Sequence, residues 1–450
     1  MTILQQCHSE RSEESLRSSE RPFAARGAAQ GDTPKIAMEK LDSYKNWDVI
    51  LAGGGPAGFF AAIRCAELNP NLRLLIIEKA SQTLGKVLIS GGGRCNVTHA
   101  CFDPAKLVTF YPRGGNELRG AFFRFQPKDT VEWFETHGVK LKTESDGRMF
   151  PVTDDSNTIA ECLRGAAKKA GVRVQVGTNL LRTEKSWGGG FRLEVRSEAQ
   201  VFHLQTKKLL IATGSNRRTL DTVKSLGHSI IDPVPSLFTF NVRDKRIDGL
   251  AGVSVDAVTL KMNSLTQRGA LLITHWGLSG PTVLRLSAWG ARELFEKEYH
   301  AKLIVNWLDE YSFDKALEIL QRNKDWVENV RRKISSAPAF SQIPLRLWKQ
   351  LAHFIGDKNW GDVSKAELRK LAGELTAGEF QIEGRGRFKE EFVTCGGVSL
   401  KEVDFKTMQS RIVENLFLAG EVLDIDGITG GFNFQSSWTT GWIAGNAMAQ

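Results

Sequence analysis

The feature that most constrains the fold is a strand–turn–helix–strand unit near the start of the chain. It reads WDVILAGGGPAGFFAAIRCAELNPNLRLLIIEK, residues 47–79. The apolar runs 48–52 and 72–77 predict two short buried strands, and residues 57–68 predict a helix that an Asn-Pro-Asn turn ends. A unit of about thirty residues is the size of a parallel crossover, so we expect an α/β domain with parallel strands.

The turn inside this unit has the glycine spacing of a dinucleotide-binding site. Gly53, Gly55 and Gly58 match GxGxxG. The first glycine permits a tight turn, the second lets a pyrophosphate approach the backbone, and the third lets the helix pack closely. Pro56 suits the first helical position, and the free N–H groups of the helix start favour phosphate. Glu78 ends the second strand, where its carboxylate can accept hydrogen bonds from ribose hydroxyls.

Three further glycine-containing turns favour a cofactor longer than NAD. Residues 85–100, GKVLISGGGRCNVTHA, offer bare backbone and the cation of Arg94 to a planar, anionic group. Residues 208–214, KLLIATG, and 416–434, LFLAGEVLDIDGITGGFNF, each begin as an apolar strand and run into glycine. NAD needs one such turn, whereas FAD extends beyond its pyrophosphate through a ribityl chain to the flavin. The spacing therefore predicts FAD.

The stretches KVLISGGGRCNVT, THWGLSGP and LFLAGEVLDIDGITGGFNFQSSWTTGW resemble signatures of the YhiN/BaiN-like family, the aminoacetone oxidase family of FAD-binding enzymes. The resemblance runs from about residue 46 to the end of the chain. It implies a Rossmann-like FAD-binding domain that is discontinuous, with an inserted β-barrel and helical region. It also implies FAD as the cofactor, while members of the family differ in substrate.

The resemblance assigns roles to the last glycine turn. Glu421 is expected at the ribityl chain or the pyrophosphate, and backbone N–H groups at the start of the last helix are expected near flavin N1 and the C2 carbonyl. A helix start there stabilises the negative charge of a reduced flavin. The predicted cofactor-binding residues are Gly53, Gly55, Pro56, Ala57, Gly58, Glu78, Lys79, Gly93, Arg94, Cys95, Asn96, Ala212, Thr213, Gly214, Gly420, Glu421, Gly430, Gly431, Phe432 and Asn433.

The expected domain organisation places an insertion inside the nucleotide-binding domain. Residues 1–45 are rich in Ser, Glu and Arg, so we expect a disordered extension, and Met38 is a plausible alternative start. Residues 46–215 are predicted to form the first part of the FAD-binding domain and 392–450 its C-terminal part. Residues 216–391, β-like and then helical, are predicted to form the substrate or cap region.

Several residues remain candidates with a structural alternative. His275 is the candidate catalytic acid or base, and Trp276 beside it a candidate pocket wall, although a structural His and a core Trp fit equally well. Cys95 is more consistent with packing beside the cofactor than with redox chemistry. For Asp424 and Asp426, capping or turn formation is favoured over a proton relay. Eight scattered histidines indicate no metal site.

Composition bounds the function less sharply. Six cysteines without a CxxC pair suit a reducing cytoplasm, and no apolar run reaches membrane-spanning length. The formal net charge of +9 fits an anionic cofactor and shows no concentrated basic block, so a small-molecule substrate is expected and no nucleic-acid partner. A second GxGxxG is missing, so NAD(P)H is expected only as a transient electron donor.

These observations give two hypotheses. The first is an FAD-dependent oxidoreductase that passes hydride between a nicotinamide or organic substrate and flavin N5. The alternative is a flavoprotein with a role in RNA modification, for which the basic excess is the argument.

Overall fold

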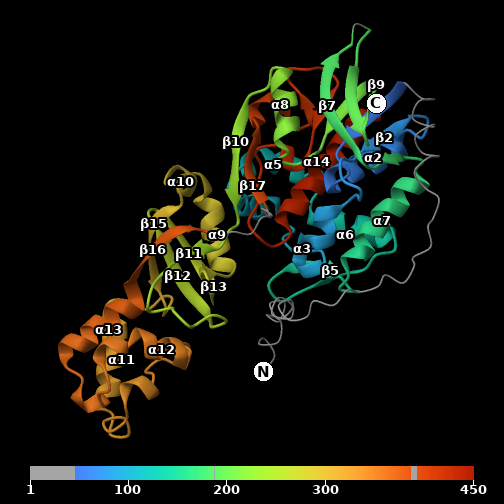
Figure 1. Ribbon diagram of the computed structural model, residues 1–450. Helices are drawn as coiled ribbons and strands as arrows, with labels where there is room; N and C mark the ends of the chain where they lie inside the picture. Colours follow the sequence, from blue (N-terminus) through green and yellow to red (C-terminus); the bar gives the residue numbers. More distant parts are fainter. Residues whose placement is uncertain (1–45, 187, 387–392) are drawn as a thin grey trace, which may run out of the picture.

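The computed structural model describes residues 46–450 except 187 and 387–392. It has three parts, which lie in a row (Figure 1). A large α/β part contains both the first and the last described elements. A barrel lies beside it, and a helical segment lies beyond the barrel. The predicted α/β class with an inserted barrel and helices is confirmed. The predictions for residues 1–45, including the start at Met38, lie outside the described residues.

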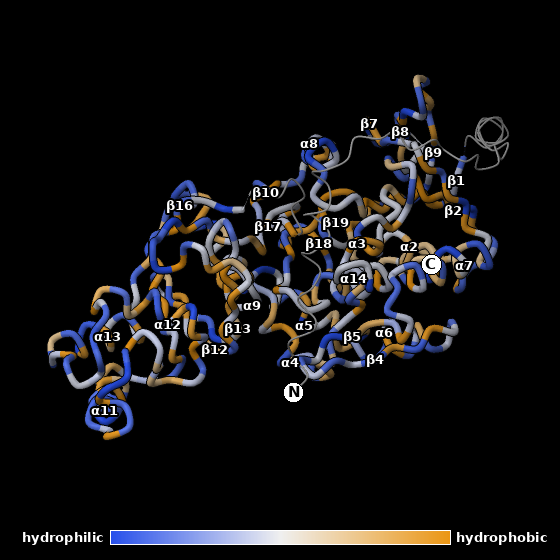
Figure 2. Tube along the Cα trace, turned by 60° about the horizontal axis from the view of Figure 1, so that its bottom comes forward, coloured by the Kyte–Doolittle hydropathy of each residue, from blue (hydrophilic) through white to orange (hydrophobic). Residues whose placement is uncertain are grey.

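The centre of the α/β part is a parallel sheet. Its strands run in the order β20 (Leu416–Leu418), β9 (Gln200–Ile211), β1 (Asn46–Ala52), β2 (Leu74–Ile77) and β6 (Arg173–Gln175), and every neighbouring pair is parallel. Every residue of β2 and β20 is buried, as expected for parallel strands covered on both faces. In Figure 2 hydrophobic orange marks β2, which reads LLII, whereas blue and orange alternate along β9, whose first residues are largely polar.

The remaining elements of the α/β part surround this sheet. The helix α2 crosses from β1 to β2 as predicted, although it begins one residue earlier. An antiparallel meander of β7 and β8 joins β9, and β18 and β19 extend the other edge. The bounds are α2 (Pro56–Leu68), α3 (Gly85–Gly93), β3 (Thr98–His99), α4 (Pro104–Leu107), α5 (Gly115–Phe122), α6 (Pro127–Thr136), β4 (Leu141–Thr143), β5 (Arg148–Pro151), α7 (Ser156–Lys169), β7 (Thr178–Lys185), β8 (Phe191–Ser197), α8 (Arg217–Ser225), β18 (Val403–Asp404), β19 (Gln409–Ser410) and α14 (Phe432–Met448).

The inserted part is a closed barrel with a helical segment. Six strands close in the order β11-β14-β13-β12-β15-β16, and a separate hydrophobic core fills the barrel and the helices. The bounds are β11 (Phe240–Asn241), β12 (Ser254–Met262), β13 (Leu265–Thr274), β14 (Gly277–Ser279), α9 (Pro281–Trp289), α10 (Ala291–Glu296), β15 (His300–Asn306), α11 (Phe313–Asp325), α12 (Leu345–Leu351), α13 (Lys365–Ala377) and β16 (Gly378–Arg385).

An antiparallel pair of strands, β10 (Ile230–Ser236) and β17 (Val393–Val398), connects the two parts. The helix α8, which precedes β10, packs against β7 of the α/β part. We therefore propose that the insertion begins after β10 rather than at residue 216. The predicted boundary near 391 lies among the residues that the structure leaves undescribed.

The first and last helices of the α/β part are packed unusually close. A Cβ atom at Gly441 of α14 would lie 2.6 Å from the backbone oxygen of Ala57, and one at Gly445 would lie 2.6 Å from that of Ala61. The glycines thus let α14 lie directly on α2. This contact brings the C-terminal turn before α14 to the same side of the sheet as the GxGxxG turn.

Asp48 at the start of β1 provides a testable electrostatic contribution. Burial raises the pKa of its carboxyl, but hydrogen bonds from the Arg73 backbone and from Lys207 and Arg73 outweigh this and lower the pKa to about 2. Because the folded pKa is depressed, the stabilisation is present above the usual pKa near 4 and is lost as pH falls toward 2. We expect Asp48→Asn to cost about 2 kcal/mol at neutral pH.

Denaturant unfolding at several pH values checks this expectation. The difference between Asp48→Asn and the wild type should shrink to about half near pH 3. Glu161→Gln, on an exposed position of α7, is the control and should change stability little at any pH. A pH-independent difference for Asp48→Asn would contradict the electrostatic origin.

Candidate functional site

The carboxyl ends of four parallel strands bring the predicted glycine turns together. Gly53 follows β1, Glu78 follows β2, Gly214 follows β9 closely, and Gly420 follows β20. Ligands of open parallel sheets bind outside this edge, where the turns after neighbouring strands meet. The sheet topology therefore makes one surface out of segments that are far apart in the sequence.

The three glycines of the first turn do different things. At Gly53, which has φ +114°, and at Gly58, an added Cβ would overlap protein backbone, namely the Ala212 carbonyl and the Gly53 carbonyl. At Gly55 an added Cβ would meet nothing within 4 Å. Gly53 and Gly58 are thus required by packing, while Gly55 borders open space at the uncapped start of α2. Pro56 occupies the first turn of that helix, and Ala57 lies buried behind it.

Glu78 is held in place by the turn itself. Its Oε2 accepts a hydrogen bond from the Gly54 backbone N–H at 2.7 Å, and its Oε1 accepts one from Ala80 at 2.8 Å. Each carboxylate oxygen keeps acceptor capacity for a hydroxyl group. The side chain is half-buried, and Lys79 beside it is exposed.

The second glycine run bends the end of α3. Gly91, Gly92 and Gly93 have φ of 58°, 68° and 83°, and a Cβ at Gly92 or Gly93 would meet nothing within 4 Å. Bare backbone is therefore presented, as expected. The Arg94 guanidinium instead pairs with Glu144 at 2.7 Å and lies over the Phe150 ring at 4.0 Å. Its cation is engaged within the protein, so the geometry does not support the expected direct role of this charge at the cofactor.

The residues after Arg94 support the C-terminal turn. The Cys95 side chain is fully buried, and burial raises the pKa of its thiol to about 12, which opposes redox reactivity. The Asn96 amide accepts a hydrogen bond from the Gly431 N–H at 3.1 Å, with its nitrogen toward the Thr98 carbonyl. Asn96 thus reaches the turn that precedes α14.

The turn after β9 contributes a buried polar atom. Thr213 Oγ1 is buried without a hydrogen-bond partner in the described part of the chain. Gly214, with φ +67°, lies beside Glu421, whose Oε1 accepts a hydrogen bond from Thr394 N–H at 3.2 Å. Glu421 also pairs with Lys86 of α3. The Glu421 carboxylate is therefore already neutralised by a cation at this edge.

The C-terminal turn ends in a helix start with no side-chain cap. Gly430 and Gly431 have φ of 126° and 92°, and the first backbone bond across the turn runs from Gln435 N–H to the Gly431 carbonyl. The N–H groups of the first turn, including those of Phe432 and Asn433, face out of the helix end. The Asn433 side chain bonds both the N–H and the C=O of Gly427 at 2.8 Å, which fixes the loop.

These features fit FAD. A long anionic cofactor needs open space at a helix start, acceptors for hydroxyl groups and donors for developing negative charge. Open space exists at Gly55, Gly92 and Gly93, Thr213 supplies an unpartnered hydroxyl, and two helix starts without side-chain caps are available.

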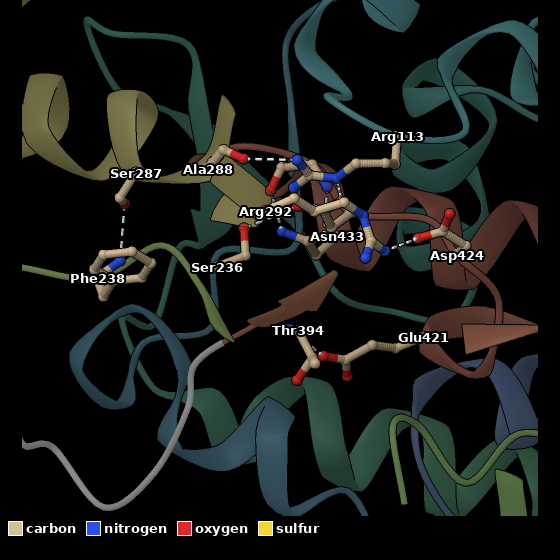
Figure 3. Close-up of polar contacts among 12 residues, drawn as sticks. Arg113, Ser236, Phe238, Ser287, Ala288, Arg292, Thr394, Glu421, Asp424 and Asn433 are labelled. Atoms are coloured by element: carbon tan, nitrogen blue, oxygen red, sulfur yellow. Dashed lines mark hydrogen bonds and ion pairs between the residues drawn. The ribbon is translucent and has the colours of Figure 1, made fainter. Parts of the chain in front are cut away.

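A buried ion pair lies beside the C-terminal turn (Figure 3). Arg113 Nε donates to Asp426 Oδ1 at 2.5 Å and its Nη2 pairs with the other carboxylate oxygen. Arg113 Nη1 donates to the Ala288 carbonyl of α9 at 2.8 Å, and Ser236 Oγ donates to Asp426 at 2.9 Å. The pair therefore ties the α/β part to both β10 and the inserted part.

Asp426 is a structural carboxylate. Its side chain is fully buried, and burial raises its pKa against the opposing effect of Arg113. Asp424 contacts Arg292 of α10, with Nη2 and Oδ1 3.4 Å apart. The Asp426 side chain thus forms a buried ion pair with Arg113, whereas the sequence favoured capping or turn formation.

The predicted catalytic residue lies elsewhere. His275 and Trp276 line a cavity of about 930 Å³ whose walls belong wholly to residues 241–383. The β13–β14 turn points toward the helical segment, where Arg346 of α12 also lines the cavity. None of the strand-end turns contributes to it. The cavity therefore does not adjoin the turns where the flavin is expected. The geometry gives no support to His275 as the acid or base.

Sequence reasoning missed several residues of the site. Lys86, Arg113, Arg292 and Thr394 were not singled out, because each meets its partner through tertiary contacts. Gly441 and Gly445 did carry a signal, a GxxxG spacing within the last helix. Among described residues no group of three metal-ligating side chains gathers, and no helix there is long and apolar enough to cross a membrane.

Comparisons with known proteins agree with this geometry. A family model described as HI0933-like protein Rossmann domain matches residues 47–447. The ribosomal RNA dihydrouridine synthase of Escherichia coli is 27% identical over 412 residues, which cover 88% of this chain and 97% of that protein. The 3-dehydro-bile acid delta(4,6)-reductase of Clostridium scindens is 26% identical over 414 residues, which cover 89% and 98%.

A solved structure extends the likeness in fold. The 3-ketosteroid-delta4-(5alpha)-dehydrogenase of Rhodococcus jostii, in complex with 4-androstene-3,17-dione, aligns with a TM-score of 0.50 at 16% identity over 91% of this chain and 97% of that one. The matches and the strand-end turns lead to one conclusion: the chain belongs to the HI0933-like protein Rossmann domain family and has the fold of an FAD-dependent oxidoreductase.

Proposed function

We propose that the protein binds FAD and reduces a carbon–carbon double bond conjugated to a carbonyl group, with NAD(P)H as the transient electron donor. The observation that carries this proposal is the uncapped start of α14 beside cationic side chains, at the edge where the flavin end of FAD would lie. Such a site favours negative charge, which appears both on a reduced flavin and on the carbonyl oxygen of the substrate.

The relatives support this reaction class. One is named for making dihydrouridine in ribosomal RNA and another for reducing delta(4,6) bonds of a bile acid. Uridine and a 3-keto delta-4,6 steroid share a carbon–carbon double bond next to a carbonyl group. The two relatives thus differ in the size of the substrate and agree in the bond that is reduced.

The chain's own residues would divide the work along the cofactor. The N–H groups at the start of α2 would hold the pyrophosphate, with Gly55 leaving room for it. Glu78 would accept hydrogen bonds from hydroxyl groups of the adenosine ribose. The Thr213 hydroxyl would donate a hydrogen bond to the ribityl chain or accept one from it. The N–H groups at the start of α14 would hold negative charge at the flavin. Bound FAD supplies hydride transfer at N5.

A second candidate is reduction of uridine within RNA. The named activity of the Escherichia coli relative and the net charge of +9 favour it. A polyanionic substrate binds through released counterions, so retention of RNA would fall steeply as salt is raised. If RNA is not retained even at low salt, a small-molecule substrate is the remaining candidate.

The test begins with the purified protein. We expect bound FAD, bleaching of the flavin by NADH or NADPH under anaerobic conditions, and reoxidation by cyclohex-2-en-1-one or 4-androstene-3,17-dione. A protein whose reduced flavin is reoxidised by oxygen and by none of these acceptors, nor by a uridine-containing RNA, would overturn the proposal.

A further inference from the structure

The side chain of Arg292 differs from the other polar groups around the C-terminal turn. It comes from α10 in the inserted part and reaches the loop that carries Asp424 (Figure 3). Its contact with Asp424 is long, at 3.4 Å, and uses one of its donors. The side chain is 36% exposed, whereas that of Asp424 is 13% exposed. Among the described residues, Arg292 therefore keeps N–H groups for another partner.

The neighbouring donors are already used within the protein. Arg113 directs Nε and Nη2 to Asp426 and Nη1 to Ala288. The Tyr111 hydroxyl donates to the Phe432 carbonyl at 2.6 Å, and the Ser236 hydroxyl donates to Asp426. The amide of Asn433 is bound at both ends by Gly427. Of the described side chains in this cluster, Arg292 is the one whose donors are mostly uncommitted.

The groups that face Arg292 compensate its positive charge only in part. Asp424 is its carboxylate partner, and Asp426 is compensated by Arg113. The Cys395 thiol nearby is buried, and burial raises its pKa to about 11, so it carries no charge at neutral pH. An oxygen that develops negative charge between α10 and the turn would thus find one guanidinium with free donors.

We propose that Arg292 binds the carbonyl oxygen of the substrate and stabilises the negative charge that forms there. This inference rests on the proposed function. Hydride adds to the β-carbon of the double bond, the π electrons move to the carbonyl oxygen to give an enolate, and a proton from solvent then adds to the α-carbon. Bound FAD would supply the hydride chemistry, with NAD(P)H as the source of the electrons. Arg292 donates hydrogen bonds to the oxygen throughout, and a guanidinium suits this because it stays protonated.

The test compares Arg292→Met with Arg292→Lys in the FAD-loaded protein. Anaerobic reoxidation of the reduced flavin by cyclohex-2-en-1-one should slow by about 100-fold in Arg292→Met, the size expected for loss of one oxyanion donor. Arg292→Lys should recover part of the rate. FAD content should be unchanged, and reduction by NADPH should slow less than reoxidation by the enone. Arg322→Met, on an exposed position of α11, is the matched control and should match the wild type.

Binding provides a readout apart from turnover. Calorimetry with 4-androstene-3,17-dione should show about a 10-fold weaker Kd for Arg292→Met, as expected for a lost hydrogen bond to a charged group. Asp424→Asn separates the two roles of Arg292. If Arg292 only anchors α10 through Asp424, both variants should lose thermal stability and both should keep wild-type affinity for the dione, which would overturn the proposal.

Two further results would count against the assignment. If the wild-type protein reduces the enone and Arg292→Met does so at the same rate, the role of Arg292 is refuted while the proposed function stands. If neither an enone nor a uridine-containing RNA reoxidises the wild-type flavin, the proposed function is refuted first. Retained affinity in Asp424→Asn with loss in Arg292→Met would support direct contact with the substrate.

Discussion

Gly55→Val is expected to give a folded protein that does not bind FAD. Gly55 has φ −91° and ψ −173°, an extended conformation that other residues adopt, and a Cβ there meets nothing within 4 Å. The branched side chain would instead fill the space at the start of α2 where a pyrophosphate would lie. The purified variant should be colourless and should keep the far-ultraviolet circular dichroism of the wild type.

Two other glycines serve as controls for Gly55→Val. Gly165→Val, on an exposed position of α7 with equally open space, should keep FAD. Gly58→Val should fail to fold, because its Cβ would overlap the Gly53 carbonyl. A yellow Gly55→Val protein with wild-type FAD content would rule out phosphate binding at this turn.

Arg113→Met is expected to destabilise the protein by about 3 to 5 kcal/mol, the usual cost of removing one partner from a buried ion pair. Asp426 would be left fully buried without its cation, and Ala288 would lose the hydrogen bond that joins α9 to the α/β part. Urea unfolding monitored by tryptophan fluorescence measures the change. FAD content should also fall, because the loop of Asp426 leads into α14.

The double variant Arg113→Met/Asp426→Asn tests the electrostatic origin of this loss. Removing the buried charge should recover part of the stability, so the two substitutions should be strongly non-additive. Additive losses would mean that Arg113 acts through packing and the Ala288 contact alone. Arg119→Met, on an exposed position of α5, controls for the loss of a cation.

The nucleotide-binding turn could be predicted because its determinants are local. The strand, the glycine spacing, the helix and Glu78 all lie within residues 47–79, and each follows from backbone geometry. The parallel pairing of the first two strands was also accessible, because a helix joins two buried apolar runs over about thirty residues. Even so, packing requires Gly53 and Gly58, while Gly55 alone of the three borders open space.

The substrate side could not be predicted in the same way. Arg113 and Asp426 are 313 positions apart, and nothing in the residues around either one indicates the other. Arg94 follows three glycines as a free cation would, but Glu144 engages it from 50 positions away. His275 stands in a glycine-bounded turn, yet the direction of that turn depends on how the barrel closes. Such contacts are fixed by tertiary packing rather than by local pattern.

The pairing of β10 with β17 has a consequence for how this architecture diversifies. Ser236 lies opposite Val393, so the chain leaves the α/β part and returns to it at neighbouring points. The segment between them can be exchanged as a unit if the graft matches two adjacent strand ends and keeps the contacts of Ala288 and Arg292 with the α/β part. The part that carries the strand-end turns would stay intact in such an exchange. Exchanging residues 237–392 between relatives would accordingly show whether the inserted part sets the substrate range.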